Sequence, residues 1–305
     1  MKRILTTTLA VSVLVLPACK GGAAADAAKL VPDEADFIVG MSPKAIGESE
    51  LYKQLAPKFE SEEDYKKAIS MFKDCGLEPL EFDAVVIGAS SGGDQVVVVV
   101  GDSVGKKDEA TCAINNFLKE AGQEANAEVV KEGGNNVIDI DQFRVYLVSD
   151  KMLAIASTDW KDPVAELIDG KGKPAVENSK KDLMGKVDTK KAIWFVATIP
   201  SELASMAAMA GPELADLTEI KTAAGSVDLS KGVALELIAG FDSDDKASAV
   251  AEKIQALNDK SKSQTPENLK GMSESVKLEA SGSDVKISAS ASMDEVEAAM
   301  SQLPM

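Results

Sequence analysis

The side chains that could do chemistry in this sequence are mainly carboxylates, because the usual catalytic partners are missing. The 305 residues include 50 aspartates and glutamates but no histidine. This composition excludes Ser-His-Asp and Cys-His catalysis and imidazole zinc sites. A hydrolase that works through carboxylates alone stays open as an alternative, and it needs two acids facing each other across a cleft. Since the sequence singles out no such pair, we expect no catalytic residues, no metal site and no cofactor.

The charge of the chain limits its partners. The formal net charge is −17, and the two arginines are Arg3 and Arg144. A strongly acidic chain repels nucleic acid, and arginine supplies most bidentate phosphate clamps. We therefore expect no nucleic-acid partner.

Two cysteines in the body of the chain have the context of a disulfide pair. Cys75 ends a helical pattern that Gly76 stops, and Cys112 lies inside an amphipathic pattern over residues 106–122. An even pair of cysteines in an oxidising compartment favours a disulfide. Two buried thiols on neighbouring helices are the alternative.

The N-terminus has the pattern of a secretory signal. A basic start, Met1-Lys2-Arg3, precedes an apolar run from Ile4 to Leu16. A membrane-spanning helix needs about 20 apolar residues, so this run is too short to span a bilayer. Basic, apolar and small-residue segments in this order are typical of a signal peptide.

The end of this signal carries a more specific motif. Leu16-Pro17-Ala18-Cys19 resembles the lipobox of bacterial lipoproteins, although Pro17 departs from the small or hydroxyl residue preferred there. The resemblance implies cleavage before Cys19 and acylation of its thiol, which predicts a signal peptide over residues 1–18. An ordinary signal cut after Ala18, with Cys19 incidental, is the alternative.

The residues after Cys19 are small and polar, so residues 19–30 are predicted to be a lipidated N-terminus and a flexible tether. Lys20, rather than aspartate, follows the cysteine. In enteric lipoproteins such a residue implies sorting to the outer membrane. We therefore expect a protein of the Gram-negative cell envelope, held in the lipid bilayer by acyl chains on Cys19.

An internal repeat predicts the fold of the remaining chain. Each copy shows a strand, a proline-started helix, a hairpin, a long amphipathic helix, a second hairpin and a short helix. Strands joined by tight turns are antiparallel, so we expect an α+β fold of two β-α-β-β-α-β-β-α units with mainly antiparallel sheets covered by helices. The two sheets either pack side by side or join into one. The units are predicted over residues 31–170 and 176–305, and the matched segments are 36–46 with 192–203, 85–102 with 224–242, and 145–168 with 276–300.

The start of the first unit, Pro32-Asp33-Glu34-Ala35-Asp36, resembles the start of the mature part of uncharacterised Gram-negative envelope lipoproteins. The resemblance covers most of the mature chain and implies no particular activity.

These observations favour a non-catalytic binding or scaffolding module over a carboxylate hydrolase of the cell envelope. Its partner would be an envelope protein or an apolar ligand. Ligand sites favour domain boundaries, so the seam between the two units is the predicted binding surface. The apolar residues expected to line it come from the two proline-started helices, and they are Ile46, Leu51, Leu203 and Met206.

Overall fold

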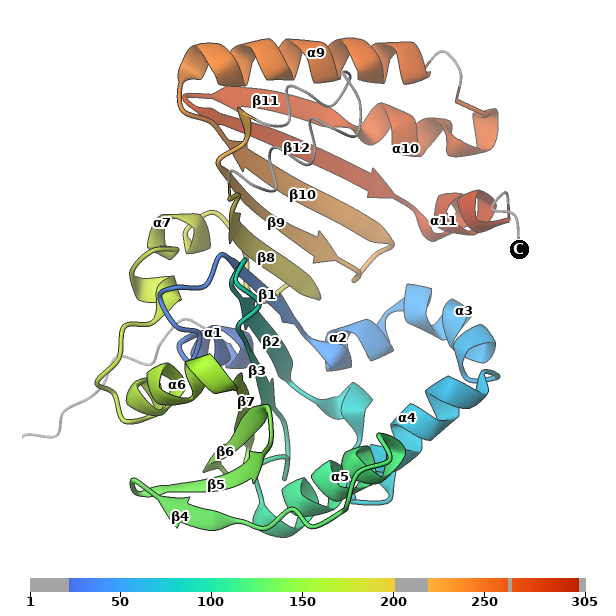
Figure 1. Ribbon diagram of the computed structural model, residues 1–305. Coiled ribbons are helices and arrows are strands. Elements are labelled where there is room, and N and C mark those ends of the chain that lie inside the picture. The colour runs from blue at the N-terminus through green and yellow to red at the C-terminus, as the bar shows by residue number, and fades with distance from the viewer. Residues whose placement is uncertain (1–21, 201–218, 263–264, 302–305) are drawn as a thin grey trace, which may run out of the picture.

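The computed structural model describes residues 22–200, 219–262 and 265–301. Its centre is one twelve-stranded sheet with the strand order β11-β12-β10-β9-β8-β1-β2-β3-β7-β6-β5-β4, and every pairing in it is antiparallel. Helices cover parts of both faces (Figure 1). The predicted α+β class with antiparallel strands is confirmed.

The two halves of the chain contribute the two halves of this sheet. The orders β1-β2-β3-β7-β6 and β8-β9-β10-β12-β11 run outward from the β1–β8 pair, and β5 and β4 extend the first. The two sheets therefore join into one. The strands of the first half are β1 (Phe37–Met41), β2 (Ala84–Ala89), β3 (Gln95–Val100), β4 (Val130–Glu132), β5 (Asn135–Ile140), β6 (Phe143–Ser149) and β7 (Met152–Ser157). Those of the second half are β8 (Ile193–Thr198), β9 (Thr222–Asp228), β10 (Val233–Gly240), β11 (Lys277–Ser281) and β12 (Asp284–Ala291).

The hairpins predicted within residues 85–102 and 224–242 are formed by β2 with β3 and by β9 with β10. Gly93 lies between β2 and β3, and Gly232 lies between β9 and β10. Both have a positive φ, of 97° and 106°, which glycine adopts without steric cost. These turns fix the strand register, and the register decides which side chains share a face of the sheet.

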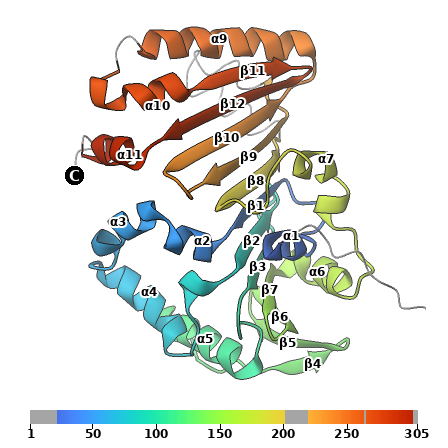
Figure 2. The same cartoon turned by 180° about the vertical axis from the view of Figure 1, so that it is seen from behind.

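The helices separate onto the two faces of the sheet. One face, here the α1 face, is covered by α1, α6 and α7, and the opposite α5 face is covered by α5 and α9 near its two ends. Figures 1 and 2 show both sets from opposite sides. The described helices are α1 (Ala23–Ala28), α2 (Pro43–Glu48), α3 (Glu50–Phe59), α4 (Glu63–Lys73), α5 (Lys107–Glu120), α6 (Lys161–Ile168), α7 (Lys181–Met184), α9 (Asp244–Lys262), α10 (Lys270–Ser275) and α11 (Met293–Met300), with 3-10 turns η1 (Pro79–Glu81), η2 (Thr158–Trp160), η3 (Ala175–Glu177) and η5 (Glu267–Leu269).

The main core lies on the α1 face of the first half. Ile38, Val86 and Val98 are fully buried there, together with Trp194 of β8. Trp194 packs directly over Gly40 of the neighbouring strand, where any side chain would collide with its ring. This core therefore crosses the β1–β8 junction and holds the two halves of the sheet together.

The expectation of a flexible tether through residue 30 is wrong for its second part. Residues 23–28 form α1, and Ala24, Ala27 and Ala28 are buried against the sheet. Small side chains at this spacing let the helix backbone approach β2 and β3 closely, so an alanine-rich stretch packs without large apolar residues. Composition alone did not predict this helix, because alanine is common in both linkers and packed helices.

Candidate functional site

The α5 face carries continuous apolar rows across the junction of the two halves. In one row the cross-strand partners Ile87, Val39 and Phe195 lie side by side on β2, β1 and β8. All three are half-buried. Sequence reasoning did not single out these residues. The continuous apolar runs over 37–41 and 193–197, which predict strands with two apolar faces, were the signal that could have found them.

A second apolar row runs parallel to the first and ends on an exposed side chain. Met41, Ile193 and Val227 are successive cross-strand partners, and Val227 pairs with Leu235 of β10. Leu235 is 39% exposed although it lies on a sheet face. Its neighbour Ala234 points to the opposite face and is also exposed. The apolar surface therefore extends from the first half well into the second.

Among the described helices, α5 and α9 cover the two ends of this face, and the apolar side chains between them are half-buried. At one end, α5 places Leu118 over the buried Ile138 and Val145. At the other, α9 places Ala247 and Val250 in one cluster with buried residues of β10 and β12. Between these ends the apolar side chains of β2, β1, β8 and β9 named above stay half-buried. Large apolar side chains that remain accessible on a sheet face are a feature of binding surfaces.

Three helices, α2, α3 and α4, form an arm that buries few side chains. Among its helical residues Ala56 is buried, whereas α2 and α4 bury none. The predicted lining residues Ile46 and Leu51 lie in this arm and are half-buried. The predicted partners from the second half, Leu203 and Met206, lie outside the described residues.

The arm differs from the single proline-started helix that the sequence predicts. Ser42 caps α2 by accepting a hydrogen bond from the amide of Ala45, as expected before Pro43. Ser49 then interrupts the helix, because its hydroxyl donates to the carbonyl of Ile46 and accepts from the amide of Tyr52. Ile46 and Leu51 are therefore on two separate helices, with a turn between them.

A disulfide and a hydrogen bond hold the far end of the arm to α5. The structure joins Cys75, just after α4, to Cys112 of α5 in a disulfide, with the Cα atoms 5.6 Å apart. Asn116 lies beside this bond and donates to the carbonyl of Met71 at 3.0 Å.

The hydroxyls of Tyr52 and Tyr65 share a hydrogen bond of 2.7 Å between α3 and α4. The pKa of Tyr52 is raised to about 12, mainly by burial and secondly by this hydrogen bond.

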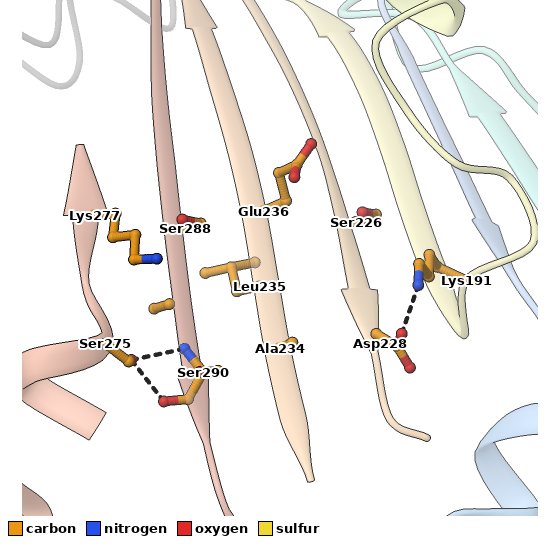
Figure 3. Close-up of a pocket in the computed structure, with 11 residues that line it drawn as sticks. Lys191, Ser226, Asp228, Ala234, Leu235, Glu236, Ser275, Lys277, Ser288 and Ser290 are labelled. Atoms are coloured by element: carbon orange, nitrogen blue, oxygen red, sulfur yellow. Dashed lines mark hydrogen bonds and ion pairs between the residues drawn. The ribbon is translucent and has the colours of Figure 1, made fainter. Parts of the chain in front are cut away.

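A polar groove lies on the other face of β9, β10 and β12. Its volume is about 460 Å³, and serine hydroxyls and charged groups make up most of its lining. Lys191 points at Asp228 in an ion pair, and the Ser275 hydroxyl donates to the carbonyl of Ser290 at 2.7 Å (Figure 3). The Lys191 ammonium and hydrogen bonds from Ser230 hold the pKa of Asp228 well below its usual range. The lining is Lys191, Ser226, Asp228, Ala234, Glu236, Ser275, Lys277, Ser288 and Ser290, together with Leu235 and Ala289, whose side chains lie on the α5 face by strand register.

A buried lysine lies beside the segment that resembles envelope lipoproteins. Lys180 is 4% exposed, and Asp33 and Asp36 are the charged groups near it. Burial lowers the pKa of Lys180 despite these two carboxylates. Asp33 accepts a hydrogen bond from the amide of Ser179 at 2.9 Å, and Asp36 accepts one from the amide of Ser91 at 2.7 Å. The two aspartates thus tie residues 32–36 to the segment between the halves and to the β2–β3 turn.

Among the described residues, no aspartate or glutamate is buried. The polar or charged side chains that are buried in the described part are those of Ser49 and Lys180. Every described aspartate or glutamate with a shifted pKa has it lowered, as in Asp33 and Glu295. A general acid needs a raised pKa instead. Arg144 is engaged as well, because it makes a two-point contact with Asp139 and an ion pair with Glu132.

Comparison with known proteins shows a relationship at the level of the fold. No protein-family model matches the chain, and no curated protein sequence matches it. Two crystal forms of TP0453, forms III and IV, match with a TM-score of 0.52 each. The alignments cover 91% of this chain and 98% and 97% of the TP0453 chains, at 8% and 9% sequence identity. The chain therefore shares its overall fold with TP0453. Within the described residues, none of the helices has both the length and the apolar composition that a membrane crossing needs.

Proposed function

We propose that this chain is a lipid-anchored protein of the Gram-negative cell envelope. The support comes from the lipobox-like Leu16-Pro17-Ala18-Cys19 and the secretory signal before it. Each buried methylene of an acyl chain contributes about 0.8 kcal/mol, and two or more chains anchor a protein stably. Lys20 after the lipidated cysteine favours the outer membrane.

The body of the protein is a non-catalytic binding module, and its ligand is apolar. The observation that carries this proposal is the pair of apolar rows on the α5 face, which cross the β1–β8 junction and stay partly accessible. Burying apolar surface contributes about 25 cal/mol per Å², so these side chains favour any apolar group that covers them. The binding surface therefore forms where the two halves meet, and it is built by strands more than by the arm.

Two neighbouring residues of β10 provide a matched test. Leu235 lies on the α5 face and Ala234 on the α1 face, and both are exposed, so a charge at either position leaves the core intact. The chain beginning at Lys20 would be titrated with the fluorescent fatty acid cis-parinaric acid. Leu235→Glu should weaken binding by about tenfold, the equivalent of 1.4 kcal/mol, whereas Ala234→Glu should not change it. Equal binding by both variants, or no binding by the unchanged chain, would refute the apolar site.

A further inference from the structure

The point at which the chain leaves the folded body is fixed on the α1 face. Ala24, Ala27 and Ala28 of α1 are at most 7% exposed and belong to the same core as Val86 and Val98. The helix starts directly after the exposed Gly22. A chain that enters through α1 therefore reaches the body from this side of the sheet.

The chain between the proposed anchor and α1 is short. Three residues, Lys20, Gly21 and Gly22, separate Cys19 from Ala23. Four Cα–Cα steps at full extension span at most about 14 Å. A body held by acyl chains on Cys19 must therefore lie almost against the lipid headgroups, with the start of α1 toward them.

The segment that follows α6 holds more lysines than acids, although Lys171, Lys186 and Lys191 form ion pairs with aspartates and Lys180 is buried. Residues 169–191 run next to the end of α1, and the amide of Ala175 donates to the carbonyl of Val31 at 2.9 Å. This segment holds seven lysines and four acids, in a chain with a net charge of −17. Lys173 and Lys181 are exposed on it. A lysine near an anionic membrane surface is attracted by about 1 kcal/mol, so these two exposed lysines offset part of the repulsion that the acidic body experiences.

We propose that the α1 face, with residues 169–191, is the surface that rests on a bilayer containing anionic phospholipid headgroups. The arm and the α5 face then point away from the membrane, because α1, α6 and α7 lie on the opposite side of the sheet from α2–α5 (Figures 1 and 2). The proposal rests on acylation of Cys19. It implies that an apolar ligand reaches the α5 face from the aqueous side and not by moving sideways out of the lipid.

Lysine acetylation on vesicles tests this orientation without altering the folded surface. The lipidated protein would be reconstituted into vesicles of phosphatidylethanolamine and phosphatidylglycerol and treated with a water-soluble acetylating reagent. Reaction rates at single lysines, followed by mass spectrometry, would be compared with those of the unanchored chain beginning at Lys20. Lys173 and Lys181 should react several-fold more slowly on vesicles, whereas the exposed Lys53 and Lys58 of the arm should react at unchanged rates.

A longer linker supplies the control. Ten glycine and serine residues inserted after Lys20 keep the anchor but remove the distance limit, so the protection of Lys173 and Lys181 should largely disappear. Equal rates on both faces of the bound protein, or protection of Lys53 and Lys58 instead, would overturn the proposed orientation. Failure of the protein to float with the vesicles would overturn the lipid anchor itself, and flotation therefore separates the two outcomes.

Discussion

Val39 and Phe195 are cross-strand partners at the junction of the two halves of the sheet, and both side chains lie on the α5 face. Their backbones pair antiparallel, so neither half alone completes this part of the surface. On the opposite side of the same strands, Gly40 and Trp194 form part of the buried core. The junction thus combines a closed, stabilising face with a partly open, apolar one.

Acylation at Cys19 can be tested directly. Mass spectrometry of the mature N-terminal peptide should show an acylated cysteine at position 19. Cys19→Ser should move the protein from the membrane fraction to the soluble fraction, or leave it uncleaved, because the thiol is the site of attachment. An unmodified N-terminus at Ala23 or beyond would contradict the prediction, and Lys20→Gly serves as a control that keeps the cysteine.

The Cys75–Cys112 disulfide should contribute strongly to stability. It closes a loop with a sequence separation of 37 residues, for which the chain-entropy model gives about 3 to 4 kcal/mol. Cys75→Ser should lower the free energy of unfolding in urea by this amount, and the double variant with Cys112→Ser should lose no more than the single one. Free thiols that titrate in the native, unreduced protein would rule the bond out.

Tyr52 should lose its proton at a higher pH than an ordinary tyrosine. Its folded pKa is raised to about 12 from 10.0, so the stability linked to its protonated form is fully present below pH 10 and is lost as the pH rises toward 12. Tyrosinate absorbance should reveal this late step. Tyr65→Phe should lower the pKa of Tyr52 but keep it above 10, because burial is the larger cause. Tyr146→Phe should leave the pKa of Tyr52 unchanged, and a complete return to 10 in Tyr65→Phe would contradict the role of burial.

Much of the fold could be predicted from the sequence, because its signals are local. Hairpin turns, alternating strands and the proline-started α2 all depend on a few neighbouring residues. The joining of the two sheets could not be predicted, since it depends on the pairing of β1 with β8 across more than a hundred residues of chain. The packing of α1 was missed for a similar reason, because its alanines are buried by strands distant in the sequence.

The candidate site could be predicted less well than the fold. The sequence predicted a binding surface between the two matched units and assigned it to helices, whereas the proposed surface is built by strands, and Ser49 divides the first of these helices into α2 and α3. The accessible apolar side chains on the strands depend on which parts of the sheet the helices leave uncovered. That coverage follows from the positions of α5 and α9, which periodicity alone does not specify.

The buried ammonium of Lys180 should lower the free energy of unfolding of the protein at neutral pH. Its folded pKa is lowered from 10.5 by burial, so the unfolded chain holds the proton more tightly than the folded one. The free energy of unfolding should therefore rise with pH between the lowered folded pKa and 10.5. Lys180→Met removes the buried ammonium and keeps most of the apolar stem, and it should raise the melting temperature at pH 7.

The pH dependence makes this prediction specific to the charge of Lys180. The advantage of Lys180→Met should shrink as the pH rises through 10.5, because above this pH the amine is neutral in both states of the unchanged protein. The exposed neighbour gives a matched control, because Lys181→Met should change stability by less than about 0.5 kcal/mol at any pH. A Lys180→Met variant that melts earlier at pH 7 would show instead that attraction by Asp33 and Asp36 outweighs the cost of burying the ammonium.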